Sequence, residues 1–217
     1  MSVMDEHIDQ RNKIFSHCAQ SPIDINVSNA EQLTLPGLKW TNYERVPQTM
    51  FLRNSGETLI LLPEWNGDAP YVRGGPFDEN YIFSAIHFHW GPTINGSEHS
   101  VDDVRMPLEM HAIHYKEKYL KFEAAKKHDD GLLFLVYFCD LKSNHSPVLD
   151  RLLSKLQHIQ KADTKVLIEP FPVEDLLNPF VSDYFLYYGS IATSTPTPVT
   201  WIITRKVTAI SPEQVEL

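Results

Sequence analysis

The chain has 217 residues, of which 42% are hydrophobic, and its formal net charge is −9. This length and apolar content are enough for one domain with a sizeable core. The excess of acidic residues disfavours binding to nucleic acid or to an anionic membrane, because contact with phosphates requires clustered Lys and Arg. No apolar run approaches the ~20 residues that span a bilayer, and residues 1–20 are too polar for a signal peptide. We therefore expect a cytoplasmic protein.

The N-terminal segment, residues 1–19, is polar and aperiodic, so we expect it to be poorly ordered ahead of one domain over residues 20–217. The two cysteines are Cys18 and Cys139. Cys139 lies in the apolar run LLFLVYFCD and is interpreted as a small buried residue, so no disulfide is expected. This pattern is typical of a reducing compartment.

The first predicted hairpin comprises strands at residues 50–53 and 58–62, joined by a turn at Asn54-Ser55-Gly56. Glu57 follows this turn. Residues 63–76 hold three prolines and three glycines and are predicted to be a loop.

The next predicted strand contains a pair of histidines. Residues 82–89 alternate in character, so His87 and His89 share one face of the strand. Two residues of strand separate Cα atoms by roughly 6.5–7 Å, which lets two imidazoles converge on one cation.

A further predicted strand, residues 108–115, places Glu109 and His111 on one face. The connection over residues 91–107 is rich in turn residues, so the two strands are expected to pair antiparallel and bring His111 beside the other two histidines. Three neutral nitrogens and an open fourth position make a catalytic zinc site. The alternative is that these histidines are surface or core residues that cluster by chance.

The C-terminal half begins with a nearly continuous apolar strand at residues 132–140. Apolar periodicity from Ser146 to Ile159, with Pro147 at the first helical position, predicts the one long helix. A short second helix is expected around Leu176-Leu177, and strands are expected at residues 184–188 and 199–206 around a loop. Many strands and few helices indicate a mainly β, α+β domain.

Several motifs of the chain resemble those of the alpha-class carbonic anhydrases. The most specific matches are HFHWG at residues 87–91, GSEH at 96–99 and E-x-H at 109–111, in the family's order and spacing. Further matches are QSPIDI at 20–25, GGPF at 74–77, DGLLFL at 130–135, YYGS at 187–190 and VTWI at 199–202. The resemblance implies a large twisted, mostly antiparallel sheet with peripheral helices and a conical cavity that ends at the metal. The family's C-terminal segment would begin about where Leu217 ends, so we expect that segment to be truncated.

The resemblance also implies a function, the reversible hydration of CO₂ to bicarbonate. His87, His89 and His111 would bind Zn²⁺, which lowers the pKa of a bound water to about 7, a value for which carbonic anhydrase is itself the reference case. Glu109 would orient His111. Glu98 would orient the hydroxyl of a gatekeeping threonine; its alternative role is that of a solvated loop acid.

Three positions around the metal depart from the family's pattern. Ala85 replaces a glutamine that would orient His87. Ala192 falls at the gatekeeping threonine, for which Thr193 is the candidate substitute. Glu57 stands where many members carry a proton-shuttling histidine, and a carboxylate with a pKa near 4.3 relays protons poorly at pH 7.

The substrate pocket implied by the resemblance is apolar. Phe134 falls where the family generally has a smaller valine. Each of these residues taken alone is as well explained as sheet core. The expected pocket residues are Ile113, Leu132, Phe134, Ile191, Val199 and Trp201.

Three functions compete. The leading interpretation is a monomeric cytoplasmic zinc carbonic anhydrase, a lyase, with reduced activity if the departures matter. The second is a catalytically silent binding module that presents a surface to a protein partner, which the retention of all three histidines disfavours. The third is a zinc esterase, but the chain lacks a G-x-S-x-G nucleophile motif.

Overall fold

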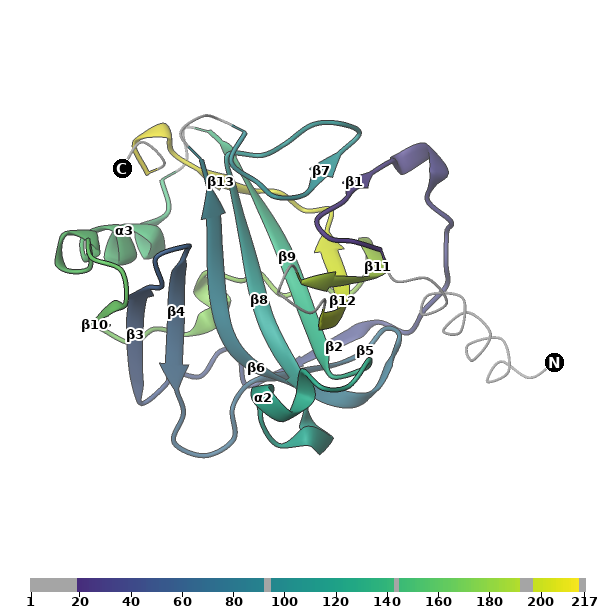
Figure 1. Ribbon diagram of the computed structural model, residues 1–217, viewed down its shortest axis with the longest axis horizontal. Helices are drawn as coiled ribbons and strands as arrows, with labels where there is room; N and C mark the ends of the chain where they lie inside the picture. Colours follow the sequence, from purple (N-terminus) through teal and green to yellow (C-terminus); the bar gives the residue numbers. More distant parts are fainter. Residues whose placement is uncertain (1–18, 92–94, 143–144, 192–196, 215–217) are drawn as a thin grey trace.

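The computed structural model describes residues 19–91, 95–142, 145–191 and 197–214. Its dominant element is an 11-stranded sheet whose main path runs β10-β3-β4-β6-β8-β9-β12-β11 (Figure 1). In chain order the strands are β1 (Asp24–Ile25), β2 (Leu38–Thr41), β3 (Thr49–Asn54), β4 (Leu59–Glu64), β5 (Tyr71–Gly74), β6 (Phe77–Trp90), β7 (Ser100–Val101), β8 (Leu108–Lys116), β9 (Leu132–Leu141), β10 (Thr164–Ile168), β11 (Tyr184–Ile191), β12 (Thr197–Thr204) and β13 (Thr208–Ile210).

The helical elements of the described residues are short and peripheral (Figure 1). They are the α-helices α2 (Phe122–Ala125) and α3 (Pro147–Leu153) and the 3₁₀ turns η1 (Val27–Asn29), η2 (Glu117–Tyr119), η3 (Leu156–His158), η4 (Val173–Asp175) and η5 (Pro212–Gln214). Within the large sheet only the pairings of β12 and β13 with β9 are parallel. The predicted mainly β, mostly antiparallel fold with peripheral helices is therefore confirmed.

Strand β9 is the centre of the core. It lies between β8 and β12 and is buried from Leu132 through Phe138 and Cys139, as the apolar run predicts. Alternate side chains project to opposite faces, where they join two separate apolar clusters. Leu133 and Leu135 pack in the cluster that also holds Leu149 and Leu152 of α3. The other cluster, around Phe134, lies on the face that carries the histidines discussed below.

The predicted loop over residues 63–76 is wrong in part, because it contains β5 and the end of β4. Strand β5 pairs with β6 and with β2, another strand that the local pattern did not predict. Val72 is fully buried there. Pro70 precedes this strand and Gly74 ends it, so neither residue interrupts it. Pairing with the distant strands β2 and β6 stabilises the strand.

The predicted long helix is also shorter than expected. Ser146 is the N-cap of α3 and accepts a hydrogen bond from the Leu149 amide at 3.5 Å. The α-helix ends at Leu153, where the Ser154 hydroxyl donates to the Arg151 carbonyl at 2.9 Å. The apolar residues whose spacing predicted one helix are therefore divided between two short elements, α3 and η3.

The remaining differences concern the ends of elements. Leu176 and Leu177 follow the single turn η4, so the short second helix is one turn long. Strand β11 continues past the predicted end at residue 188 to Ile191, and β12 both begins and ends two residues earlier than predicted. Residues 1–18 and 192–196 lie outside the described part of the chain. No helix among the described residues is long and apolar enough to cross a membrane.

Candidate active site

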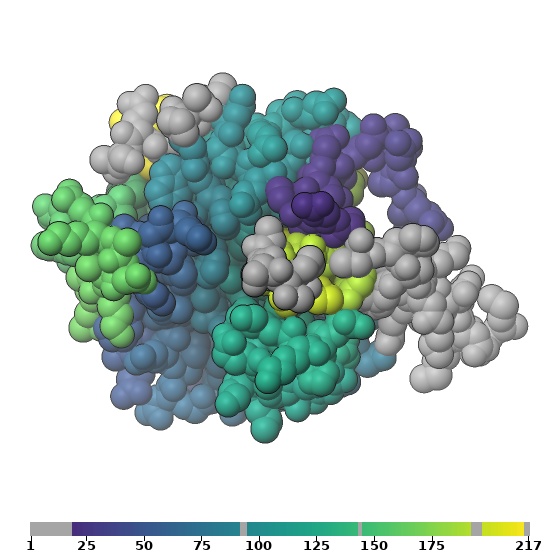
Figure 2. All heavy atoms as spheres, viewed as in Figure 1, coloured from purple at the N-terminus to yellow at the C-terminus, as the bar shows by residue number. Residues whose placement is uncertain are grey.

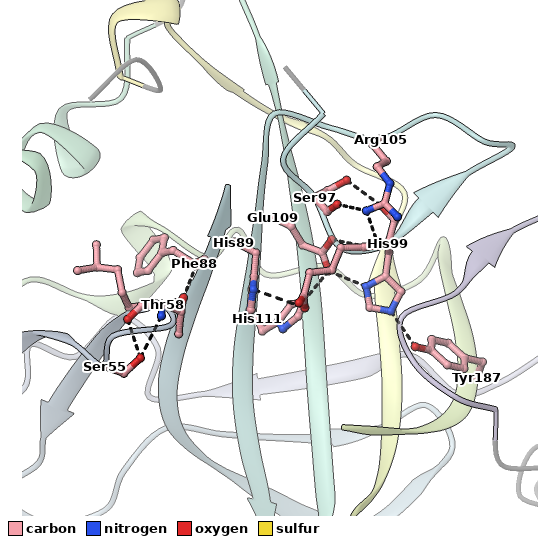
Figure 3. A network of polar contacts seen from close by, with 12 residues as sticks. Ser55, Thr58, Phe88, His89, Ser97, His99, Arg105, Glu109, His111 and Tyr187 are labelled. Atoms are coloured by element: carbon pink, nitrogen blue, oxygen red, sulfur yellow. Dashed lines mark hydrogen bonds and ion pairs between the residues drawn. The ribbon is translucent and has the colours of Figure 1, made fainter. Parts of the chain in front are cut away.

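The histidine strands pair as their periodicity predicts. In the antiparallel pairing of β6 with β8, His87 lies opposite His111 and His89 lies opposite Glu109. Residues opposite each other in such a pair project to the same face of the sheet. Ile86 and Phe88, the neighbours of His87 in β6, are buried in the apolar cluster on the other face. The three histidines therefore share one side of the sheet. Figure 3 shows two of them, His89 and His111, side by side.

The spacing of possible ligand atoms defines two groups. Those of His89, Glu98 and His111 all lie within 4.8 Å of one another, as do those of His99, Glu109 and His111. The ring centroids of His89 and His111 are 4.3 Å apart. His87 belongs to neither group, so its relation to the site rests on its strand position opposite His111.

Glu109 is the buried acceptor of this site. Its Oε1 lies 2.5 Å from His111 Nε2 and 2.6 Å from His99 Nδ1, and its Oε2 accepts from the His99 amide at 2.8 Å. Burial by itself raises the pKa of the Glu109 carboxyl, but His111 and His99 lower that pKa to well below its usual range. An ionised Glu109 accepts from His111 Nε2–H, which leaves Nδ1 of His111 as the nitrogen with a lone pair.

His99 is a residue of the site for which the sequence predicted no role. It is fully buried, and its Nε2 lies 2.7 Å from the Tyr187 hydroxyl, which donates to Ser21 Oγ at 2.9 Å (Figure 3). This chain of contacts connects the N-terminal QSPIDI motif and β11 to Glu109. The GSEH motif contains the residue, but only the fold shows that its ring points inward.

His87 and His89 are in the charge state that metal binding requires. Burial, with the charge of His111 as a smaller contribution, lowers the pKa of His87 to about 4. Burial likewise lowers the pKa of His89 to about 3. Nε2 of His89 is buried and has no hydrogen-bond partner among the described residues. A lone pair left buried without a partner is costly, and a metal ion at this nitrogen would satisfy it. The donor set thus fits zinc.

The predicted pocket residues come together beside His111. Their shared apolar cluster includes Phe134, whose ring centroid is 5.0 Å from that of Trp201 and 6.3 Å from that of His111. The ring centroid of Trp201 lies 5.1 Å from that of His111. The buried members are Ile113, Leu132, Phe134, Val199 and Trp201, with Ile191 half-buried against them.

A cleft of about 450 Å³ opens next to His89 and Glu98. Pro22 and Glu57 line it, and Figure 2 shows the surface hollowed between the purple and blue segments that hold them. Glu57 is exposed on a turn whose Thr58 hydroxyl donates to the Phe88 carbonyl (Figure 3). The cleft therefore connects Glu57, the expected proton relay, with His89.

Two of the predicted functional positions, Ala192 and Thr193, lie outside the described residues. Ala85 is buried in β6, opposite Ile113, and its methyl group offers no acceptor to His87.

The fold and the site define a β-sheet protein with a candidate histidine metal centre between an apolar pocket and an open cleft. Comparison with known proteins gives the family. The family described as eukaryotic-type carbonic anhydrase matches residues 6–217, so the chain belongs to that family.

Individual relatives agree with this assignment. The chain is 34% identical over 201 residues to mitochondrial carbonic anhydrase 5B of Mus musculus, an alignment that covers 91% of this chain and 62% of that protein. It is 32% identical over 201 residues to carbonic anhydrase 7 of Mus musculus, covering 91% of this chain and 75% of the relative. It is 31% identical over 203 residues to carbonic anhydrase 6 of Homo sapiens, covering 90% and 64%. The chain spans less than two thirds of the length of the mitochondrial 5B relative.

Proposed function

We propose that this protein is a zinc carbonic anhydrase that hydrates CO₂ reversibly to bicarbonate, with His87, His89 and His111 as the zinc ligands. The proposal rests on the hydrogen bonding of two imidazole rings, those of His111 and His89. His111 is held by the ionised Glu109 through Nε2, while His89 keeps a buried Nε2 without a partner among the described residues. Two lone pairs are therefore available on one face of the sheet, and His87 lies opposite His111 to supply the third.

Zinc bound here would supply the Lewis acidity that makes water a nucleophile near neutral pH, the chemistry for which carbonic anhydrases are the reference case. The chain's own residues supply the surroundings. The apolar cluster around Phe134 and Trp201 offers a non-polar molecule such as CO₂ a dry position beside His111. Glu109 fixes the tautomer of His111.

The proton released by hydration has to leave through the cleft. Glu57 lines that cleft together with His89 and Glu98 and is the candidate relay. A carboxylate exchanges protons near neutral pH less effectively than an imidazole, so we infer that proton transfer restrains turnover. We also propose that Thr193 supplies the hydroxyl that Ala192 lacks.

A catalytically silent, protein-binding module is the second candidate, and one observation favours it. His87 lies outside both groups of closely spaced ligand atoms, so a metal held by three histidines requires its ring to approach the other two. A protein that has lost the metal site would bind no zinc at stoichiometric level.

The cellular compartment is a further proposal. Cys139 is buried as a free thiol, which supports a reducing compartment. Because relatives include proteins named as mitochondrial, subcellular fractionation has to separate the proposed cytoplasmic location from a mitochondrial one. Size-exclusion chromatography tests the proposed monomer.

Zinc content is the first test of the proposed function. Elemental analysis of the wild-type protein should find about one zinc per chain, and His111→Ala should lose it, because that variant removes a proposed ligand. His128→Ala, in which an exposed histidine stacked on Tyr119 is removed, is the matched control and should keep its zinc. Equal zinc in wild type and His111→Ala would refute the ligand assignment.

A further inference from the structure

Glu98 lies at the boundary between the cleft and the histidines. Its side chain is 43% exposed, whereas that of His89 is 21% exposed. Glu98 Oε2 lies 3.5 Å from His89 Nδ1 and 4.0 Å from His111 Nε2. The carboxylate is thus near Nδ1 of His89, whereas the other ring nitrogen, Nε2, has no partner among the described residues.

The other carboxylate of the site is already committed. Glu109 lies opposite His89 in the strand register, but its oxygens contact His111 and His99. His89 Nδ1 has no ion-pair contact with Glu109 among the described residues, and Glu98 is the carboxylate within ion-pair distance of it. Glu109 is therefore occupied by His111 and His99, and Glu98 is left to contact His89.

The loop that carries Glu98 is held in place from both sides. Ser97 Oγ donates to the His99 carbonyl at 2.7 Å and accepts from the Met106 amide at 2.8 Å. The Arg105 guanidinium donates to the main-chain carbonyls of Ser97 and Glu98, the latter at 3.0 Å (Figure 3). Main-chain anchoring on each side of Glu98 fixes its Cα, so its carboxylate reaches His89 by rotation of the side chain alone.

We propose that Glu98 is a positioning residue for His89: it accepts a hydrogen bond from Nδ1–H and so fixes the tautomer and the ring plane that turn Nε2 towards the metal. The proposal rests on the proposed zinc site. The separation of 3.5 Å is longer than a normal hydrogen bond, so the proposed bond would require a small rotation of the Glu98 side chain. This role differs from the one implied by family resemblance, in which Glu98 orients a gatekeeping hydroxyl. The first role affects metal binding, and the second affects turnover.

The test compares Glu98→Ala with Glu98→Gln. Both variants remove the negative charge, but only the alanine removes the acceptor. Zinc dissociation constants, measured by competition with a chelator, should rise about 10–100-fold for Glu98→Ala and stay within about threefold of wild type for Glu98→Gln. Ring ¹H–¹⁵N correlation spectra of the zinc-loaded proteins provide a second readout. The slowly exchanging His89 Nδ1–H should be seen in wild type and Glu98→Gln and be lost in Glu98→Ala, while the His111 Nε2–H signal is unchanged.

Three outcomes would overturn the proposal while the zinc site stands: unchanged affinity and an unchanged His89 signal in Glu98→Ala, equal losses of affinity in both variants, or a loss of turnover without a loss of zinc. The last result would support the gatekeeping role instead. Failure of the wild-type protein to bind zinc would refute the proposed function and this inference with it. The wild-type measurement therefore separates the two.

Discussion

His114 provides a test of the structure that is independent of the metal. It is fully buried in β8, where its Nε2 lies 2.5 Å from the Tyr43 hydroxyl and its Nδ1 donates to the Ala112 carbonyl at 3.0 Å. Burial lowers the pKa of His114 to about 3, although the backbone hydrogen bonds oppose the shift. The ring is therefore neutral in the folded protein at every pH at which the protein is expected to work.

The direction of the effect follows from the two states. A histidine in the unfolded chain takes up a proton below pH 6.5, whereas His114 in the folded protein does so only near pH 3. Its contribution to stability is complete above pH 6.5 and is lost progressively as the pH falls towards 3. A pH of 5 is 1.5 units below the pKa of the unfolded state, so at this pH the stability lost amounts to about 2 kcal/mol.

The perturbation is the double variant Tyr43→Phe/His114→Leu, which replaces both hydrogen-bonding partners by apolar groups and leaves neither unsatisfied. Urea unfolding of metal-free protein at pH 7.5 and pH 5 gives the change in the free energy of unfolding. Wild type should lose about 2 kcal/mol more than the double variant over this interval, since contributions from His87 and His89 are common to both. Tyr43→Phe alone keeps His114 and should lose as much stability as wild type between pH 7.5 and pH 5, although it starts from a lower stability. Equal acid-induced losses in wild type and the double variant would refute the neutral, buried state of His114.

Three further predictions concern the pocket, the relay and the packing. Phe134→Val should raise kcat/KM for CO₂ at constant zinc affinity, with a loss of about 2 kcal/mol in stability, because it opens space beside Trp201; an unchanged kcat/KM in folded, zinc-loaded protein would exclude the pocket as the restraint. Glu57→His should make CO₂ hydration less dependent on imidazole buffer, and a wild-type rate identical in weak and strong imidazole would contradict a limiting proton transfer. Gly131→Ala should cost about 3 kcal/mol in urea unfolding, because its Cβ would overlap the Ala125 carbonyl; a variant as stable as wild type would show that this close approach is wrong.

The features that the sequence predicted well depend on local periodicity. The alternation in β6 and β8 determines which face carries His87, His89 and His111, and the turn-rich connection determines that the strands pair. The continuous apolar run predicted the burial of β9 for the same reason. These patterns require no knowledge of distant segments.

The features that were missed depend on contacts between distant parts of the chain. Strand β5 forms because β2 and β6 pair with it on either side. The proline and glycine that flank it led the local sequence pattern to predict a loop. His99 acquires a role only because β8 and β11 bring Glu109 and Tyr187 to its two nitrogens. The roles of Glu98, Glu57 and Thr193 stay predictions.

The central claim is that this chain hydrates CO₂ at a zinc ion held by its histidines. Stopped-flow CO₂ hydration on protein with measured zinc content, alongside His111→Ala, tests it most directly. The account predicts zinc-dependent hydration by wild type that a tight chelator abolishes and added zinc restores, and none above background by His111→Ala. Zinc-loaded wild-type protein with no more activity than buffer, or equal activity in the two proteins, would contradict it.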